Sequence, residues 1–245
     1  MDFYQPKVET ELLQWQYDML KQPGLINKLS KRTQEKINSY IPEKIHNAIT
    51  VVVKQMIKAV LFGARYTTQK PLQNATLYQR ESEVINKIKI YTNTAAIEGG
   101  LTGAGGIFLG LADFPLLITI KIKLLYEIAS LYGFDLNDYK ERVYLLHIFE
   151  LAFSSDQHRK DIYLKMVDWD VKSRQLPEDI NQFEWRKFQQ EYRDYLDLAK
   201  MAQLIPVIGA PIGFFVNRKL LKKLGLTAMN AYRMRILQKP LLPDL

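Results

Sequence analysis

The chain of 245 residues contains no cysteine and only three histidines. The lack of cysteine excludes a disulfide scaffold, thiolate metal sites and a thiol nucleophile, and it is compatible with a reducing cytoplasm. The first twenty residues include acidic side chains and no long apolar core, so they do not form a secretory signal. We therefore expect a cytoplasmic protein, with association at the cytoplasmic face of the membrane left open.

Motifs for metal, nucleotide and acyl-transfer chemistry are also missing. Glu43 and His46 have the Glu-x-x-His spacing of a di-iron half-site, which needs a second copy elsewhere in the chain. The residues three positions before His147 and His158 are Tyr144 and Ser155 instead of glutamate, so there is no second copy. The glycines match neither a P-loop nor a Rossmann fingerprint, and no GxSxG elbow occurs. We expect no metal and no cofactor, and the sequence favours a non-enzyme without deciding the question.

The distribution of charge is uneven along the chain. Residues 1–197 carry 26 basic and 25 acidic side chains, whereas residues 198–243 carry eight basic side chains and no acidic one. No RNP motif or zinc knuckle accompanies this charge, which argues against nucleic acid. Two interpretations stay open, a solvated basic tail and a segment that binds anionic lipid. The candidate membrane- or anion-binding residues are Arg218, Lys219, Lys222, Lys223, Arg233 and Arg235.

Residues 95–120 contain six of the twelve glycines in an apolar run. The pairs Gly99/Gly103 and Gly106/Gly110 have the small-xxx-small spacing that lets helices touch. Asp113 and Pro115 interrupt the 20-residue apolar stretch 101–120, so we favour a buried or surface-embedded helical hairpin over a membrane span. A second short apolar segment carries two more candidate packing glycines, Gly209 and Gly213.

The hydrophobic pattern is helical nearly throughout and predicts an all-α protein built around the glycine-rich hairpin. We expect helices over residues 12–20, 43–62, 77–91, 113–132, 139–153, 157–174 and 178–204, followed by a basic C-terminal helix. Residues 1–72 supply N-terminal helices and residues 73–240 a helical core, which together form one continuous domain.

Four polar residues are candidate functional groups: Glu98, Asp113, His147 and Glu150. Asp113 before Phe-Pro is most simply a helix N-cap, with a functional carboxylate as the alternative. Glu98 has Lys121 or Lys123 as a possible partner across the hairpin. His147 and Glu150, one helical turn apart, favour a local polar pair over a catalytic acid and base.

Three segments together resemble the EcsC family over residues 75–240: Glu98-Gly-Gly-Leu-Thr-Gly-Ala-Gly-Gly with Asp113-Phe-Pro, the run 121–135 ending in Tyr-Gly-Phe-Asp, and Ile-Pro-Val-Ile-Gly-Ala from residue 205. This bacterial family is named for a protein encoded beside an ABC transporter whose ATPase and membrane subunits are linked to secretion. The resemblance implies a setting beside transporter subunits, and we expect a non-enzymatic accessory protein that acts with them. The alternative is a lipid- or amphiphile-handling module that uses the apolar hairpin.

Overall fold

The computed structural model describes residues 4–21, 43–62, 70–103, 106–156, 158–196 and 210–238. Within these ranges the side chains of residues 44–46, 94–113 and 210–216 are not described. The described backbone is helical, with two short 3-10 turns and one isolated bridge between Ser154 and Leu196 in place of any sheet. The all-α prediction is confirmed.

The long helices are α1 (Tyr4–Leu20), α3 (Glu43–Phe62), α4 (Leu77–Gly103), α5 (Gly106–Tyr132), α6 (Tyr139–Phe153) and α11 (Ala210–Leu237). The shorter elements are α7 (Arg159–Met166), α8 (Trp169–Lys172), α9 (Trp185–Tyr195) and the 3-10 turns Ser173–Gln175 and Ile180–Gln182.

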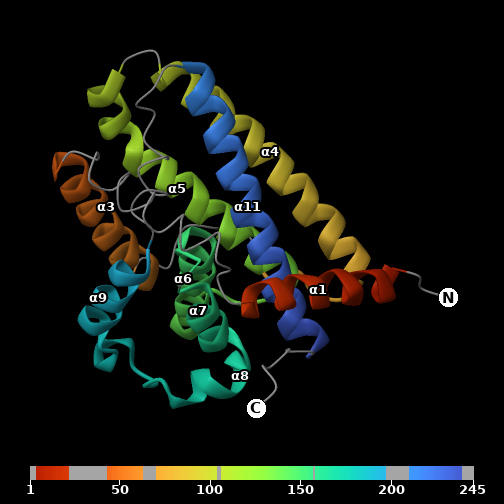
Figure 1. Cartoon of the computed structure of the whole chain (residues 1–245). Helices are drawn as coiled ribbons and strands as arrows, with labels where there is room; N and C mark the ends of the chain where they lie inside the picture. Colours follow the sequence, from red (N-terminus) through yellow and green to blue (C-terminus); the bar gives the residue numbers. More distant parts are fainter. Residues whose placement is uncertain are drawn as a thin grey trace.

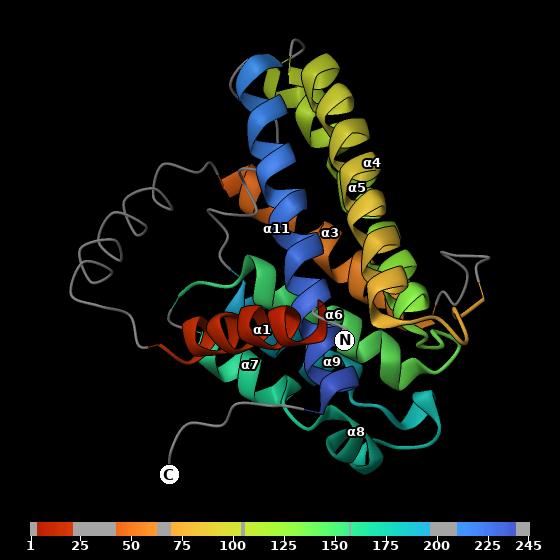
Figure 2. The ribbon, with the colours of Figure 1, turned by 90° about the vertical axis from the view of Figure 1, so that its right-hand side faces the viewer.

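Helices α4, α5 and α11 pack pairwise into a three-helix arm (Figure 1). Helices α1 and α6 pack against α11, whereas α3 packs against α5 and α6. Seen from the side, the upper ends of these three helices rise beyond the rest of the molecule, and α1 lies across α11 near its C-terminal half (Figure 2). Helix α11 therefore contacts α1, α4, α5 and α6 and forms the axis of the fold.

The crossing of α4 and α11 is tight at a glycine outside the predicted ladder. A Cβ atom added to Gly225 would lie 2.6 Å from Cγ1 of Ile88, closer than real Cβ contacts. Glycine there lets the two backbones approach, because it has no side chain to separate them. The predicted close packing at Gly99, Gly103, Gly106 and Gly110 remains a prediction, since these positions lie in helix ends without described side chains.

Helix α5 does not restart at Asp113. It begins at Gly106 and keeps Pro115 inside, so the expectation of an N-cap at Asp113 is wrong. Proline removes one intrahelical hydrogen bond and normally ends or kinks a helix. Here the residues around it, Phe114, Leu117 and Ile118, are buried in the core, and this packing outweighs the local signal.

Two later boundaries also differ from the prediction. The segment after Ser154 begins its helix at Arg159, with His158 as an N-cap that makes no side-chain bond, and it breaks at Asp168, whose φ is +54°. The charged segment expected to start at residue 178 becomes a 3-10 turn followed by α9, which begins at Trp185. Other boundaries agree: Asp138 caps α6 by accepting from the Lys140 amide, and Gly133 follows α5 with φ +93°.

The core draws on most helices. Helix α6 is the most enclosed element, since thirteen of its fifteen residues are buried. Arg142 of α6 lies in this core and donates to the Leu61 carbonyl at the end of α3 from Nε (3.1 Å) and Nη2 (2.9 Å). Burial lowers the pKa of Arg142, but its guanidinium satisfies helix-end carbonyls that otherwise lack donors.

Candidate functional site

Helix α11 carries the six basic residues singled out in the sequence, and the structure divides them into two groups. Arg218, Lys219 and Lys222 are exposed on one face of the helix. Lys223 is also exposed, but its Nζ donates to the Ala152 carbonyl at 2.6 Å. Leu226 continues the same face and is 42% exposed. We call these five residues the basic face.

Arg233 and Arg235 do not belong to this face. Their side chains are only 6% and 5% exposed, and each contacts two carboxylates of other helices. The membrane- or anion-binding role expected for these two arginines is therefore not available to them. The basic surface is narrower than the sequence predicts.

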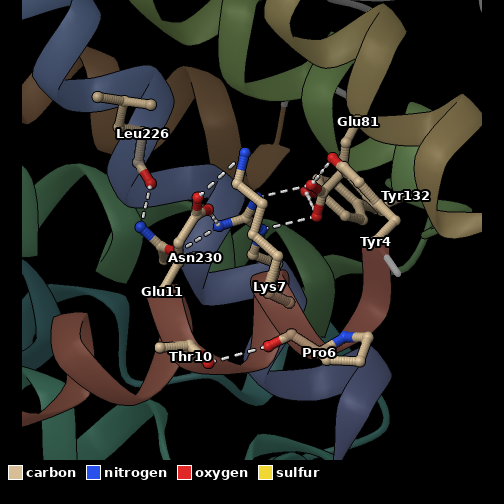
Figure 3. Close-up of polar contacts among 10 residues, drawn as sticks. Tyr4, Pro6, Lys7, Thr10, Glu11, Glu81, Tyr132, Leu226 and Asn230 are labelled. Atoms are coloured by element: carbon tan, nitrogen blue, oxygen red, sulfur yellow. Dashed lines mark hydrogen bonds and ion pairs between the residues drawn. The ribbon is translucent and has the colours of Figure 1, made fainter. Parts of the chain in front are cut away.

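The Arg233 site lies where α1, α4, α5 and α11 meet (Figure 3). Arg233 donates two hydrogen bonds of 2.6 Å to Glu81 of α4, from Nε to Oε1 and from Nη2 to Oε2. Its Nη1 donates to Glu11 of α1 at 3.0 Å and to Asn230 at 3.2 Å. Bidentate geometry of this kind makes the strongest arginine–carboxylate contacts.

Two tyrosines complete the shell of Glu81. Tyr4 donates its hydroxyl to Oε2 at 2.5 Å, and Tyr132 donates to Oε1 at 3.2 Å. Burial raises the pKa of both tyrosines, and the negative charge of Glu81 raises it further. Burial alone lowers the pKa of Arg233, but the hydrogen bonds and charge of Glu81 outweigh it, so the pKa of Arg233 is raised. The fully buried Glu81 carboxylate thus accepts four bonds.

The Arg235 site lies on another side of α11. Arg235 donates to both oxygens of Glu141 of α6, at 2.6 and 2.8 Å, and to Asp170 of α8. The guanidinium carbon lies 4.0 Å from the ring centre of Phe134 and 4.7 Å from that of Tyr144. Burial lowers the pKa of Arg235, but the hydrogen bonds that it donates to Glu141 and Asp170 outweigh burial and raise this pKa.

His147 and Glu150 form the local pair that their spacing predicts. His147 Nδ1 lies 2.9 Å from Glu150 Oε2, and both residues are buried. The imidazole packs edge-on against the rings of Trp169 (5.6 Å) and Phe188 (5.4 Å). Burial raises the pKa of the neighbouring Tyr192, and the Glu150 charge adds to this. The contact orients the imidazole in a crowded interior, as expected for a structural polar pair.

Several of the remaining candidate residues lie where the structure does not describe side chains. Glu98 lies in α4 and Asp113 in α5, but neither side chain is described. Lys121 is fully buried between α5 and α11 and donates to Asn217 Oδ1 at 3.0 Å, whereas Lys123 is exposed. The pairing of Glu98 with Lys121 therefore stays a prediction. Gly209 lies outside the described residues.

Sequence reasoning missed the acidic partners of the two arginines. Glu81 falls in the charged segment 79–90 that reads as a solvated helix surface, yet Val84 and Ile88, three and seven residues later, are buried on the same face. That spacing is the one signal that could have placed Glu81 inside. Glu141 has the same signal, since Tyr144 and Ile148, three and seven residues later, are buried. The pairing of each of these carboxylates with its arginine depends on helices far apart in sequence.

Comparison with known proteins places the chain in a family. The model of the EcsC protein family matches residues 6–237. The chain belongs to the EcsC family. It is 44% identical to Protein EcsC of Bacillus subtilis (strain 168) over 230 residues, which cover 94% of each chain. It is 28% identical to the Uncharacterized protein YdbA of the same strain, over 92% of this chain and 90% of that protein. No solved structure matches.

The family match reaches back to residue 6 and so includes α1, which the sequence resemblance to the EcsC family did not cover. The structure agrees with this extent, since Glu11 of α1 enters the Arg233 site. Among the helices of the described part, none combines the length and hydropathy needed to cross a bilayer.

Proposed function

We propose that this EcsC-family chain is a non-enzymatic accessory protein that acts with an ABC transporter system and is held at the cytoplasmic membrane surface by the basic face of α11. The family membership supports the setting, and the basic face is the single observation that carries the mode of attachment.

The basic face has the composition expected of a surface that meets anionic lipid. Residues 217–238 contain no acidic side chain, so nothing on α11 itself opposes the charge of Arg218, Lys219 and Lys222. The opposite side of the helix is buried through Leu220, Leu221 and Leu224, which fixes the orientation of the basic side. Each such residue contributes about 1 kcal/mol near an anionic membrane.

The neighbouring helix α4 adds to this surface. Lys89 is exposed, and Ile85, three residues before the Ile88 that meets Gly225 of α11, is 52% exposed. Helices α4 and α11 lie side by side in both views (Figures 1 and 2). Apolar side chains among cations strengthen binding at a membrane interface.

Flotation with vesicles tests the attachment. The protein should float with vesicles that contain anionic lipid, should not float with neutral vesicles, and should be released as salt rises. Arg218→Gln/Lys219→Gln/Lys222→Gln should abolish flotation. The matched control is Lys54→Gln/Lys58→Gln/Arg186→Gln, which removes the same charge from exposed positions of α3 and α9.

Equal flotation of the two triple variants would refute the role of the basic face. A separate experiment tests the accessory role. It asks whether the ATPase or membrane subunit of the transporter co-purifies with the protein from membranes of cells that express wild type or the variants. Flotation without co-purification would leave a membrane-surface protein and would overturn the link to the transporter. The lipid-handling alternative rests on the glycine-rich hairpin, where side chains are not described, and gains no support here.

A further inference from the structure

A cleft of about 270 Å³ opens beside the Arg235 site, between the last turn of α11 and the segment that joins α7 to α8. Met166, Trp169, Val171 and Met234 form its apolar walls. Asp168, Asp170, Arg235 and Gln238 supply its polar groups.

The charge of this cleft is opposite to that of the chain. The whole protein has a formal net charge of +8, but the cleft is lined by two carboxylates and one guanidinium. A third carboxylate, Glu141, does not line the cleft but is bonded to that guanidinium. Arg235 is held by Glu141 and Asp170 and lies over two aromatic rings, so it is already neutralised. The excess negative charge favours a cationic ligand.

Asp168 contributes the carboxylate that the fold leaves unused. It precedes α8 at the N-cap position, but its side chain makes no capping hydrogen bond. The residue is exposed and lines the cleft. An aspartate at this position normally caps the helix. Because Asp168 does not, its carboxylate is available to a ligand.

Trp169 is the second, independent feature of the cleft. Its side chain lines the cleft while the residue is only 5% exposed, and its Nε1–H has no acceptor. The rings of Tyr144 and His147 pack against the indole at 5.4 and 5.6 Å and hold it in place. A buried donor without an acceptor costs free energy, and a ligand carbonyl would satisfy it.

We propose that this cleft binds a lysine side chain of a peptide segment. Its ammonium group would lie between Asp168 and Asp170, its methylene stem would pack against the exposed side chain of Val171, and a peptide carbonyl would accept from Trp169 Nε1. Carboxylates beside an aromatic ring are the usual surroundings of a bound ammonium group. This site is distinct from the basic face and does not depend on the proposed function.

The test follows the indole N–H resonance of Trp169 by NMR, assigned with Trp169→Phe, while the intact protein is titrated with N-acetyl-lysine N-methylamide. A saturable shift is expected. N-acetyl-norleucine N-methylamide, which lacks the ammonium group, should give no shift. n-Butylamine, which lacks the carbonyls, should bind more weakly than the lysine amide; equal binding would overturn the role given to the indole N–H.

Asp168→Asn should weaken binding of the lysine amide about fivefold, the effect of one partly exposed charge. Asparagine also tolerates a positive φ, so this variant keeps the fold. The matched control is Asp161→Asn, an exposed carboxylate on α7 that does not line the cleft. Equal affinity of the two variants would overturn the proposal. Tighter binding after Lys239→Gln would also overturn it, because it would assign the cleft to the chain's own C-terminal segment.

Discussion

Each of the two arginine sites of α11 pairs one buried arginine with two carboxylates, but the sites differ in how water reaches those carboxylates. Arg233 and Arg235 are two residues apart, so their side chains leave the helix on nearly opposite sides. Arg233 meets the fully buried Glu81 and, at the edge of the site, Glu11, which is 48% exposed. Arg235 meets Glu141 and Asp170, whose side chains are 14% and 60% exposed, so neither of its carboxylates is fully buried.

This difference decides what each site does for the fold. The Arg233 site joins α1, α4 and α5 to α11 through a carboxylate that has no access to water. The Arg235 site joins α6 and α8 to α11, and its carboxylates keep contact with solvent. Removing the arginine therefore strands a buried charge in the first site and an accessible one in the second.

The largest expected effect comes from breaking the buried pair. Arg233→Met should lower the free energy of unfolding by about 3–5 kcal/mol, because Glu81 is left charged and buried. The measurement is denaturation by urea, followed by circular dichroism. The double variant Glu81→Gln/Arg233→Met should recover much of the loss, since no buried charge remains. A double variant as unstable as the single one would show that the loss comes from packing instead.

Arg235→Met should cost less, about 2 kcal/mol, which is the scale of hydrogen bonds to charged groups. Water can solvate Asp170 and reach Glu141 once the arginine is gone. The same urea experiment compares this variant directly with Arg233→Met. If the two variants lose equal stability, solvent access does not separate the sites and the comparison fails.

Alkaline pH should weaken both sites through their tyrosines. Burial raises the pKa of Tyr132 at the first site and of Tyr144 at the second. The folded protein therefore holds these protons above the ordinary tyrosine pKa of about 10, where the unfolded chain loses them. Their contribution is complete below pH 10 and falls as pH rises, by about 1.4 kcal/mol per pH unit for each tyrosine.

Urea titrations at several pH values between 9 and 11 measure this slope. Tyr132→Phe and Tyr144→Phe should each reduce the slope of the unfolding free energy against pH by the contribution of one tyrosine, at most about 1.4 kcal/mol per pH unit. An unchanged slope in one variant only would mean that its tyrosine ionises as readily in the folded protein as in the unfolded chain, and would locate the more open site.

The smallest expected effects concern Tyr4 and Asp170, the side chains at the edges of the two sites. Tyr4→Phe removes one bond to the buried Glu81 and should cost about 1 kcal/mol, whereas Asp170→Asn at an exposed position should change stability by less than that. Thermal melting of both variants beside wild type resolves the difference. A larger loss for Asp170→Asn would reverse the assignment of the buried and the accessible site.

The sequence predicted individual elements where local signals agree with packing. The start of α3 behind Pro42, the Asp138 cap of α6 and the glycine after α5 all follow from residue chemistry within one turn. The contact of His147 with Glu150 also follows from helical spacing. The local signal at Asp113-Phe-Pro predicted a helix start that is wrong. Helix α5 continues through Pro115, because the apolar residues beside the proline are buried.

The roles of the C-terminal arginines show the limit of sequence reasoning at the candidate site. Composition marked residues 198–243 as uniformly basic, and Arg218 and Lys222 are exposed as that pattern suggests. Arg233 and Arg235 have the same composition around them but meet acids from residues 11, 81, 141 and 170. Helical spacing places Arg235 on the buried face, four and seven residues after Ala231 and Ala228. The same spacing places Arg233 on the exposed face, so only the structure shows that it is buried.

The sequence by itself determined the helical class, the family, the approximate position of most helices and the concentration of positive charge near the C-terminus, because each depends on residues close together in the chain. Only the tertiary structure decided which of those charges are neutralised, where α4 and α11 touch at Gly225, and that Asp168 and Trp169 border an acidic cleft. These features need groups from distant segments to meet, and a charge acts on its partner through distance and solvent access, neither of which the order of residues specifies.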